Sequence, residues 1–315
     1  MIAIFYRQNG KLVVAQSETE LSRINRSDVL WIDLLSPSGE EKHSVDDFLG
    51  EEIQSRAQAE EIESSSRFFE TENAIFANTN FLMPGPEDYS MEAVSFIFVE
   101  SCLTTLRDVP LRSFTELQRR LLIMPQLFPT GYSIFASIMD QRVDLDADMI
   151  ELMSKEIAQY SKRINQQEDI NEDFLIDINQ LQENTMIVRE NIVDKQRLIG
   201  NLMKSDKYPP ELQARFSIIL QDITSLINHT NFSFERLEYL QDTVVGLINL
   251  DQNNIMKIFT LVSVLLMPPT LVASFYGMNV PLPFMGSRWA WVGIILFMVL
   301  TVAIVVILFR KKKMF

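Results

Sequence analysis

The chain has 315 residues, with 28 Lys and Arg against 42 Asp and Glu, and a formal net charge of −14. A surface this acidic repels phosphate backbones, so nucleic acid is not an expected partner. One cysteine, Cys102, and two distant histidines, His43 and His229, argue against a disulfide framework, a zinc site and a histidine-based triad. All 42 acidic residues precede Asn253, so an acidic front part is joined to a basic, apolar end.

Residues 1–130 have the pattern of a mixed α/β domain. Two apolar runs flank Asn9-Gly10, which favours a hairpin because both residues tolerate positive φ. Further strands are expected at VLWIDL, NAIFANTNFLM and SFIFVE, and helices are expected from near Ser36-Pro37 and at SFTELQRRLLI. The absence of a phosphate-binding glycine loop and of repeats favours a regulatory or scaffold domain over an enzyme.

Residues 131–207 have helical periodicity and no proline, and the polar stretch Gln166–Asp173 divides them. This pattern predicts a helical hairpin with the polar stretch at its tip. Residues 208–257 are expected to form a stalk helix that opens at Tyr208-Pro209-Pro210. The 57 residues from Glu211 to Met267 contain no proline. At 1.5 Å per residue they predict a rod of roughly 85 Å that runs directly into the apolar end.

Two uncharged runs, of 19 residues at 258–276 and 21 residues at 289–309, predict transmembrane helices. Each spans roughly 30 Å, the thickness of the hydrocarbon core of a bilayer. Residues 277–288 form a short loop between them, and residues 310–315 form a basic tail. The positive-inside rule places this tail, and with two crossings also the large N-terminal part, in the cytoplasm.

The first predicted span carries a stripe of small and polar residues on one face. The stripe follows the 3.5-residue period of packed helices. Two interpretations are open: close packing of helices, or a water-filled pore lined by this span, which several chains would have to enclose. Its members are Asp242, Gly246, Asn249, Asn253, Met256, Thr260, Ser263, Met267, Thr270 and Ser274.

The chemistry of the stripe favours a pore for a hydrated ion. Both predicted spans lack carboxylates, histidines and lysines, which a proton relay or a dehydrated metal site would use. Amides, hydroxyls and thioethers are present instead. Magnesium releases its waters reluctantly and is often held through them, so amide oxygens at a pore mouth suit it.

The first span ends in Tyr276-Gly277-Met278-Asn279. This YGMN sequence, before a short loop and a second terminal span, resembles the signature of the CorA family of magnesium transporters, as does the preceding IMKIFTLVSVLLMPPTLVASF. The resemblance implies a homopentameric funnel in the inner membrane, with the first spans lining the pore. It also implies a selectivity filter of Gly277, Met278 and Asn279 supported by Tyr276, and an inner polar ring of Asn253.

The sequence leaves two alternative functions open. Many family members carry an acidic residue in the outer loop, whereas Val280–Arg288 has none. The related zinc-transporting ZntB proteins also tend to lack loop acids, although their tripeptide is usually not GMN. A membrane-anchored coiled-coil receptor without a pore is the alternative from a different class. Met278 favours the magnesium branch, and the stripe argues against a plain anchor.

We expect passive, channel-like entry of Mg²⁺ driven by the membrane potential, with Co²⁺ or Ni²⁺ as further cargo and with no organic cofactor. Residues 1–252 carry a net charge of −20, and cytoplasmic Mg²⁺ bound between subunits would relieve their mutual repulsion and close the pore. No local motif identifies the regulatory ligands. The candidates are Asp242, Glu168, Asp169, Glu172 and Asp173.

Overall fold

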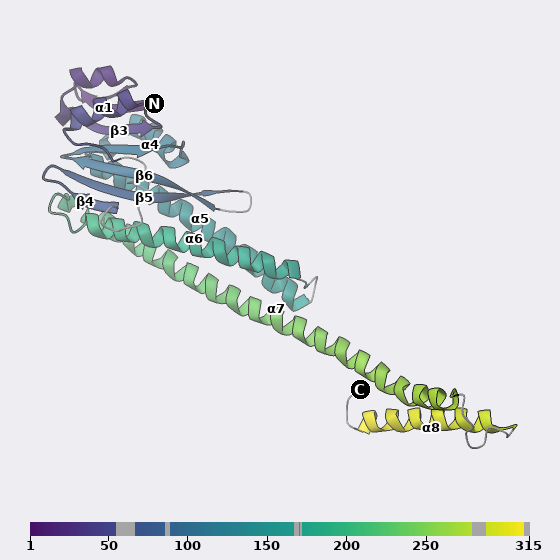
Figure 1. The fold of residues 1–315 in the computed structure, drawn as a ribbon. Coiled ribbons are helices and arrows are strands. Elements are labelled where there is room, and N and C mark those ends of the chain that lie inside the picture. Colours follow the sequence, from purple (N-terminus) through teal and green to yellow (C-terminus); the bar gives the residue numbers. More distant parts are fainter. Residues whose placement is uncertain (55–66, 86–88, 167–169, 171, 279–287, 312–315) are drawn as a thin grey trace. The chain divides into compact units, whose positions relative to one another are not determined.

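The computed structural model describes residues 1–54, 67–85, 89–166, 170, 172–278 and 288–311. The chain forms two compact units, one of residues 1–241 and one of residues 242–315. Helix α7 (Gln213–Tyr276) contributes to both (Figure 1). The predicted order of an α/β part, a helical hairpin, a stalk helix and two apolar C-terminal helices is confirmed.

Unit 1 is built on a seven-stranded sheet with the order β2-β1-β3-β7-β6-β5-β4. Strands β3 and β7 run parallel, and the other neighbouring pairs run antiparallel. The strands are β1 (Ile2–Gln8), β2 (Lys11–Ala15), β3 (Val29–Leu35), β4 (Phe68–Glu70), β5 (Ala74–Pro84), β6 (Tyr89–Val99) and β7 (Cys102–Arg107).

The predicted hairpin at Asn9-Gly10 is confirmed, with φ of 50° and 76° at these two residues. Strand β7 was not expected from the sequence. It follows β6 after a turn in which Glu100 has φ of 53°, a conformation that a side chain other than Gly, Asn or Asp seldom adopts. Without a glycine the turn left no signal, so no strand was predicted after SFIFVE.

Both faces of the sheet are covered, because the side chains of β6 alternate between two cores. Ile97 and Val99 face the core that contains Val45 and Leu49 of α1 (Gly39–Leu49). Phe96 and Phe98 face the other side, where their rings lie 4.9 Å from Phe135 and 4.5 Å from Tyr132, respectively. That second side is covered by α4 (Arg112–Ile123), α5 (Gly131–Gln166) and α6 (Glu172–Leu202).

The predicted first helix begins slightly later than expected, at Gly39. Ser38 caps it through a reciprocal capping box with Glu41, and the bond from the Ser38 backbone N–H lowers the pKa of Glu41. In the described part of the chain, short 3₁₀ helices lie in the connections: η1 (Glu18–Arg23), η2 (Arg26–Asp28), η3 (Pro125–Leu127) and η4 (Pro210–Leu212).

A buried ionic cluster connects α5 to α6 beneath the sheet. The Asp146 carboxylate lies 2.6 Å from the Arg142 guanidinium and 2.9 Å from the Lys195 ammonium, and all three side chains are at least 95% buried. Lys195 also donates to Asn191, whose amide donates to the Asn80 carbonyl of β5 at 2.6 Å. Burial lowers the pKa of Lys195 to about 8. The cluster therefore anchors both long helices to the sheet.

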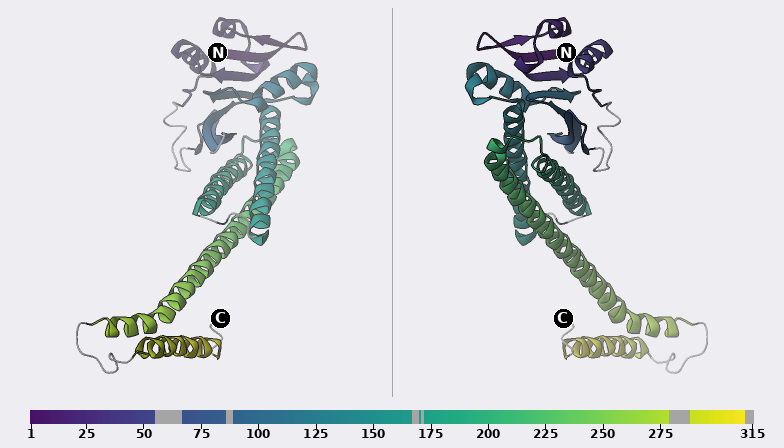
Figure 2. Two further views of the ribbon diagram at one scale, coloured as in Figure 1. Left: turned by 90° about the vertical axis from the view of Figure 1, so that its right-hand side faces the viewer. Right: turned by 90° about the vertical axis from the view of Figure 1, so that its left-hand side faces the viewer.

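Unit 2 consists of the C-terminal part of α7 and helix α8 (Ala290–Lys311), which lies beside it in each view (Figures 1 and 2). Helix α7 continues through Pro268 and Pro269. A proline removes one backbone hydrogen bond but is tolerated where neighbouring groups satisfy the helix. Two helices in the described residues are long and apolar enough to cross a membrane, and they are α7 and α8.

Candidate functional site

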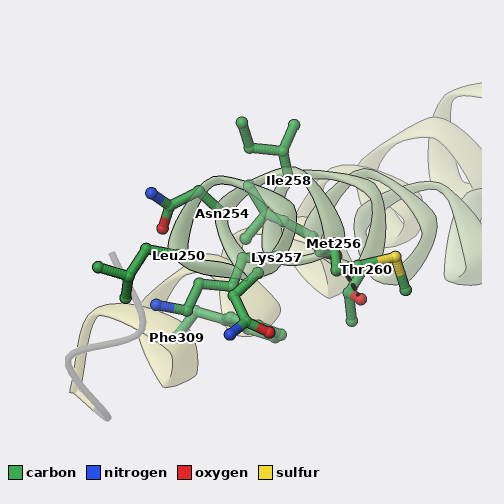
Figure 3. A pocket seen from close by; sticks show the side chains of 9 residues that line it. Leu250, Asn254, Met256, Lys257, Ile258, Thr260 and Phe309 are labelled. Carbon is green, nitrogen blue, oxygen red and sulfur yellow. Dashed lines mark hydrogen bonds between the residues drawn. The ribbon is translucent and has the colours of Figure 1, made fainter. Parts of the chain in front are cut away.

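The candidate site lies on the unit 2 portion of α7, where the stripe residues form two concave surfaces. The first has a volume of about 580 Å³ (Figure 3). Asn253, Met256 and Thr260 of the stripe line it, together with Lys257 and with Phe309 from the end of α8. The structure thus brings the three N-terminal stripe residues of the predicted pore lining together.

The second concave surface, of about 740 Å³, lies further along the same helix. Its lining includes Ser263, Met267, Thr270 and Ser274, which are the remaining predicted lining residues of the stripe. Met278 of the predicted filter lies on the same surface. The two surfaces together contain all seven predicted lining residues, and every one of them is exposed in the single chain.

Over residues 261–272, the face of α7 opposite the stripe is more buried than the stripe. At 100° per residue its members lie roughly half a turn around the helix from the stripe. Val272, which is 8% exposed, is its most buried member. The partly buried and buried residues of this face are Leu265, Pro269 and Val272. In the single chain the stripe is exposed, whereas these residues of the opposite face are partly or fully buried.

Two stripe hydroxyls have a defined orientation. Thr260 donates to the Met256 carbonyl and Thr270 to the Leu266 carbonyl, each at 2.7 Å. A hydroxyl has one hydrogen and two lone pairs, so these oxygens offer acceptor capacity to the open side of the helix. Acceptors match the shell of a hydrated cation, whose waters direct their hydrogens outward. The stripe can therefore bind a hydrated ion through its waters.

The described part of the predicted filter is tightly turned. Tyr276 ends α7, and Gly277 donates to the Ala273 carbonyl at 2.9 Å. A Cβ on Gly277 would lie 3.1 Å from that carbonyl oxygen, so a larger residue would disturb this turn. Met278 is half exposed. Asn279, the third filter residue, lies outside the described residues.

Three of the five predicted regulatory acids, Asp173, Asp242 and Glu172, lie within the described residues. Within the described ranges, no group of three or more His, Cys, Asp or Glu side chains could hold a metal ion. Asp173 and Asp242 are exposed, in unit 1 and unit 2 respectively. Glu172 begins α6, and Glu168 and Asp169 lie outside the described residues.

Lys257 lines the site but was not predicted as a site residue from the sequence. It lines the first concave surface beside the stripe, and the chain has no acidic residue after it. Its position directly before a 19-residue uncharged run was the available signal. Phe309 gave no such signal, because its place beside α7 depends on how the two helices pack.

Comparisons with known proteins agree over the whole chain. A sequence profile described as CorA-like Mg²⁺ transporter protein matches residues 26–311. The magnesium transport protein CorA of Wolinella succinogenes is 34% identical over 320 residues, which is 99% of each chain. Among solved structures, the CorA magnesium transporter from Methanocaldococcus jannaschii superposes with a TM-score of 0.81 at 17% identity and covers 99% of this chain and 98% of its own.

A protein of the rival ZntB branch is similar to this chain in its fold. The ZntB cytoplasmic domain from Vibrio parahaemolyticus matches with a TM-score of 0.58 at 16% identity, over 79% of this chain and 98% of that domain. The sequence relationship, by contrast, is with magnesium transport proteins. Members of that family are transporters rather than enzymes. The chain therefore belongs to the CorA-like Mg²⁺ transporter family.

Proposed function

We propose that this protein is a channel for hydrated Mg²⁺ in the inner membrane, with the α7 stripe as the wall of its pore. The observation that carries the proposal is the surface of α7 in unit 2: its polar stripe is exposed, and Leu265, Pro269 and Val272 on its apolar opposite face are partly or fully buried. Two helices cannot enclose a pore. The stripes of several chains, five by the family resemblance, therefore face a common axis.

The lining suits passage better than tight binding. Thioethers at Met256 and Met267 alternate with oxygen acceptors at Thr260 and Thr270. Apolar rings of this kind can close a pore by expelling water. Asn253 forms the polar ring at the inner mouth, and Gly277, Met278 and Asn279 form the outer filter. Carboxylates are absent from the sequence after Asp251, so the ion is not held by charge within the pore.

Entry is driven by the membrane potential. A potential of 100 mV contributes about 2.3 kcal/mol per charge, and hence roughly twice that for a divalent ion. The basic C-terminus and the acidic front part are then both cytoplasmic. Closure by cytoplasmic Mg²⁺ follows from the charge of the front part, where bound cations relieve repulsion between subunits. Co²⁺ and Ni²⁺ are expected to share the pathway with Mg²⁺.

The test is Mg²⁺ entry into proteoliposomes that contain a magnesium-sensitive dye, under an inside-negative potential. Wild type should admit Mg²⁺ at a rate that grows with the potential, and Asn279→Ala should lose this entry while it assembles normally. Asn228→Ala, on the unit 1 part of α7, is the matched control and should behave like wild type. Entry that survives Asn279→Ala would remove the filter assignment. Zinc entry under a pH gradient, without Mg²⁺ entry, would move the protein to the zinc branch.

A further inference from the structure

The concave surface of about 580 Å³ has a second flank that the pore does not use. This flank consists of Leu250, Lys257, Leu261 and Phe309. On the helix it lies roughly a third of a turn from the centre of the stripe, toward the side of α8. Figure 3 shows the Lys257 side chain extending toward Leu250, near Phe309. The flank thus combines one cation with apolar walls from both helices of unit 2.

The positive charge of this flank is not paired with a carboxylate among the described residues. The chain has no acidic residue after Asp251, and α8 ends in Arg310 and Lys311 within the described residues. Among the described side chains, no carboxylate forms an ion pair with Lys257. A positive pocket between membrane helices is a site at which anionic headgroups bind.

We propose that this pocket binds an anionic phospholipid, with its phosphate on the Lys257 ammonium and an acyl chain against Leu250, Leu261 and Phe309. A soluble phosphate would leave the apolar walls in water, whereas a phospholipid covers the walls and the cation together. Lys257 precedes the uncharged run, so its ammonium can reach headgroup level while its stem lies along the apolar surface. The proposal rests on unit 2 crossing the membrane, as in the proposed function.

A bound lipid at this position would act on the inner end of the pore. Lys257 follows Met256 of the stripe directly and lies one helical turn from Asn253 and Thr260. A phosphate that holds Lys257 on the outer flank keeps its charge away from the axis, where it would repel an entering cation. The lipid is therefore a structural ligand of the conducting assembly.

Native mass spectrometry of the purified full-length protein in detergent tests this proposal. The protein is titrated with phosphatidylglycerol and with phosphatidylcholine that has the same acyl chains. Wild type should retain phosphatidylglycerol in preference, and Lys257→Gln should lower that retention by about fivefold, the equivalent of one basic residue near a membrane surface. Phe309→Ala should also lower retention, and Lys257→Arg should preserve it.

Two matched variants separate this site from general effects. Arg288→Gln removes one positive charge before the other end of α8, and Phe297→Ala removes an exposed ring from α8 outside the pocket. Both should retain lipid like wild type. Equal retention in Lys257→Gln, Phe309→Ala and wild type would overturn the proposal, and so would equal binding of the two lipids. Because lipid retention is measured without ion flux, a channel that fails to conduct would not be mistaken for a failed lipid site.

Discussion

Replacing Asp146 with Asn should destabilise unit 1 far more than an equivalent change on its surface. The Asp146 carboxylate contacts Arg142 at 2.6 Å and Lys195 at 2.9 Å, and neither cation is more than 5% exposed. The neutral amide leaves two buried positive charges without a counter-ion. Breaking a buried ion pair in this way costs about 3–5 kcal/mol, because the remaining charge keeps its desolvation penalty.

In a unit of this size each kcal/mol lowers the melting temperature by about 2–4 °C, so the expected loss is roughly 6–20 °C. Thermal unfolding of the full-length protein in detergent, followed by intrinsic fluorescence, measures it. The matched control is Asp140→Asn on the same helix. Asp140 pairs with Arg215 at 3.1 Å, but the two side chains are 50% and 34% exposed. Such a surface pair contributes about 0–1 kcal/mol.

A triple variant tests the physical cause directly. Changing Arg142 to Met, Asp146 to Leu and Lys195 to Met together removes all three charges and keeps much of the buried volume. Replacing a complete buried ionic cluster by apolar residues is often neutral or stabilising, so this variant should recover most of the lost stability. An Asp146→Asn protein that melts within a degree or two of Asp140→Asn would refute the reasoning.

Three further outcomes follow from Lys195, from Cys102 and from the stripe. The pKa of Lys195 is lowered from 10.5 to about 8, so between these values the unfolded chain holds a proton that the folded chain has lost. The free energy of unfolding of wild type, relative to Lys195→Met, should therefore rise across that pH range by up to about 1.4 kcal/mol per unit, and a flat difference in denaturant titrations would contradict this. Burial raises the pKa of the Cys102 thiol to about 12, so a hydrophilic thiol reagent at neutral pH should add no mass to the native protein. Thr270→Val removes an acceptor from the stripe and should reduce Mg²⁺ flux by roughly fivefold or less. Thr224→Val, which breaks an equivalent 2.7 Å bond to a helix carbonyl in unit 1, should leave flux unchanged.

Local signals in the sequence were sufficient for much of the fold. Asn9-Gly10 identified the first hairpin because the turn requires positive φ at both positions. Strand β7 was missed because its turn places Glu100 at positive φ without a glycine, a conformation that is held in place by the pairing of β6 with β7 on either side. Helix α7 continues past Pro268, as expected from the uncharged run of residues 258–276, which predicted a helix despite its two prolines.

The stripe was predictable because a regular period places its residues on one face of any helix. Whether that face would be open could not be predicted, since this depends on where α8 lies. The Arg142–Asp146 pair illustrates the same limit. Its four-residue spacing is typical of exposed helix pairs, and only the packing of α5 and α6 against the sheet buries it. Lys257 likewise lies beside Phe309 only because of how α7 and α8 are placed, which the sequence does not indicate.

The central claim is that the stripe, and not the rest of α7, faces the water-filled pathway. Ser263 and Val262 test it most directly, because they are neighbours at the same depth and both are exposed in the single chain, but only Ser263 lies on the stripe. Each residue is changed to Cys in turn, because the buried Cys102 thiol is not expected to react with a hydrophilic reagent. Mg²⁺ entry into proteoliposomes is then measured before and after such a thiol reagent is added. The reagent should block Ser263→Cys and leave Val262→Cys conducting. Equal block of the two variants, or block of Val262→Cys alone, would contradict it.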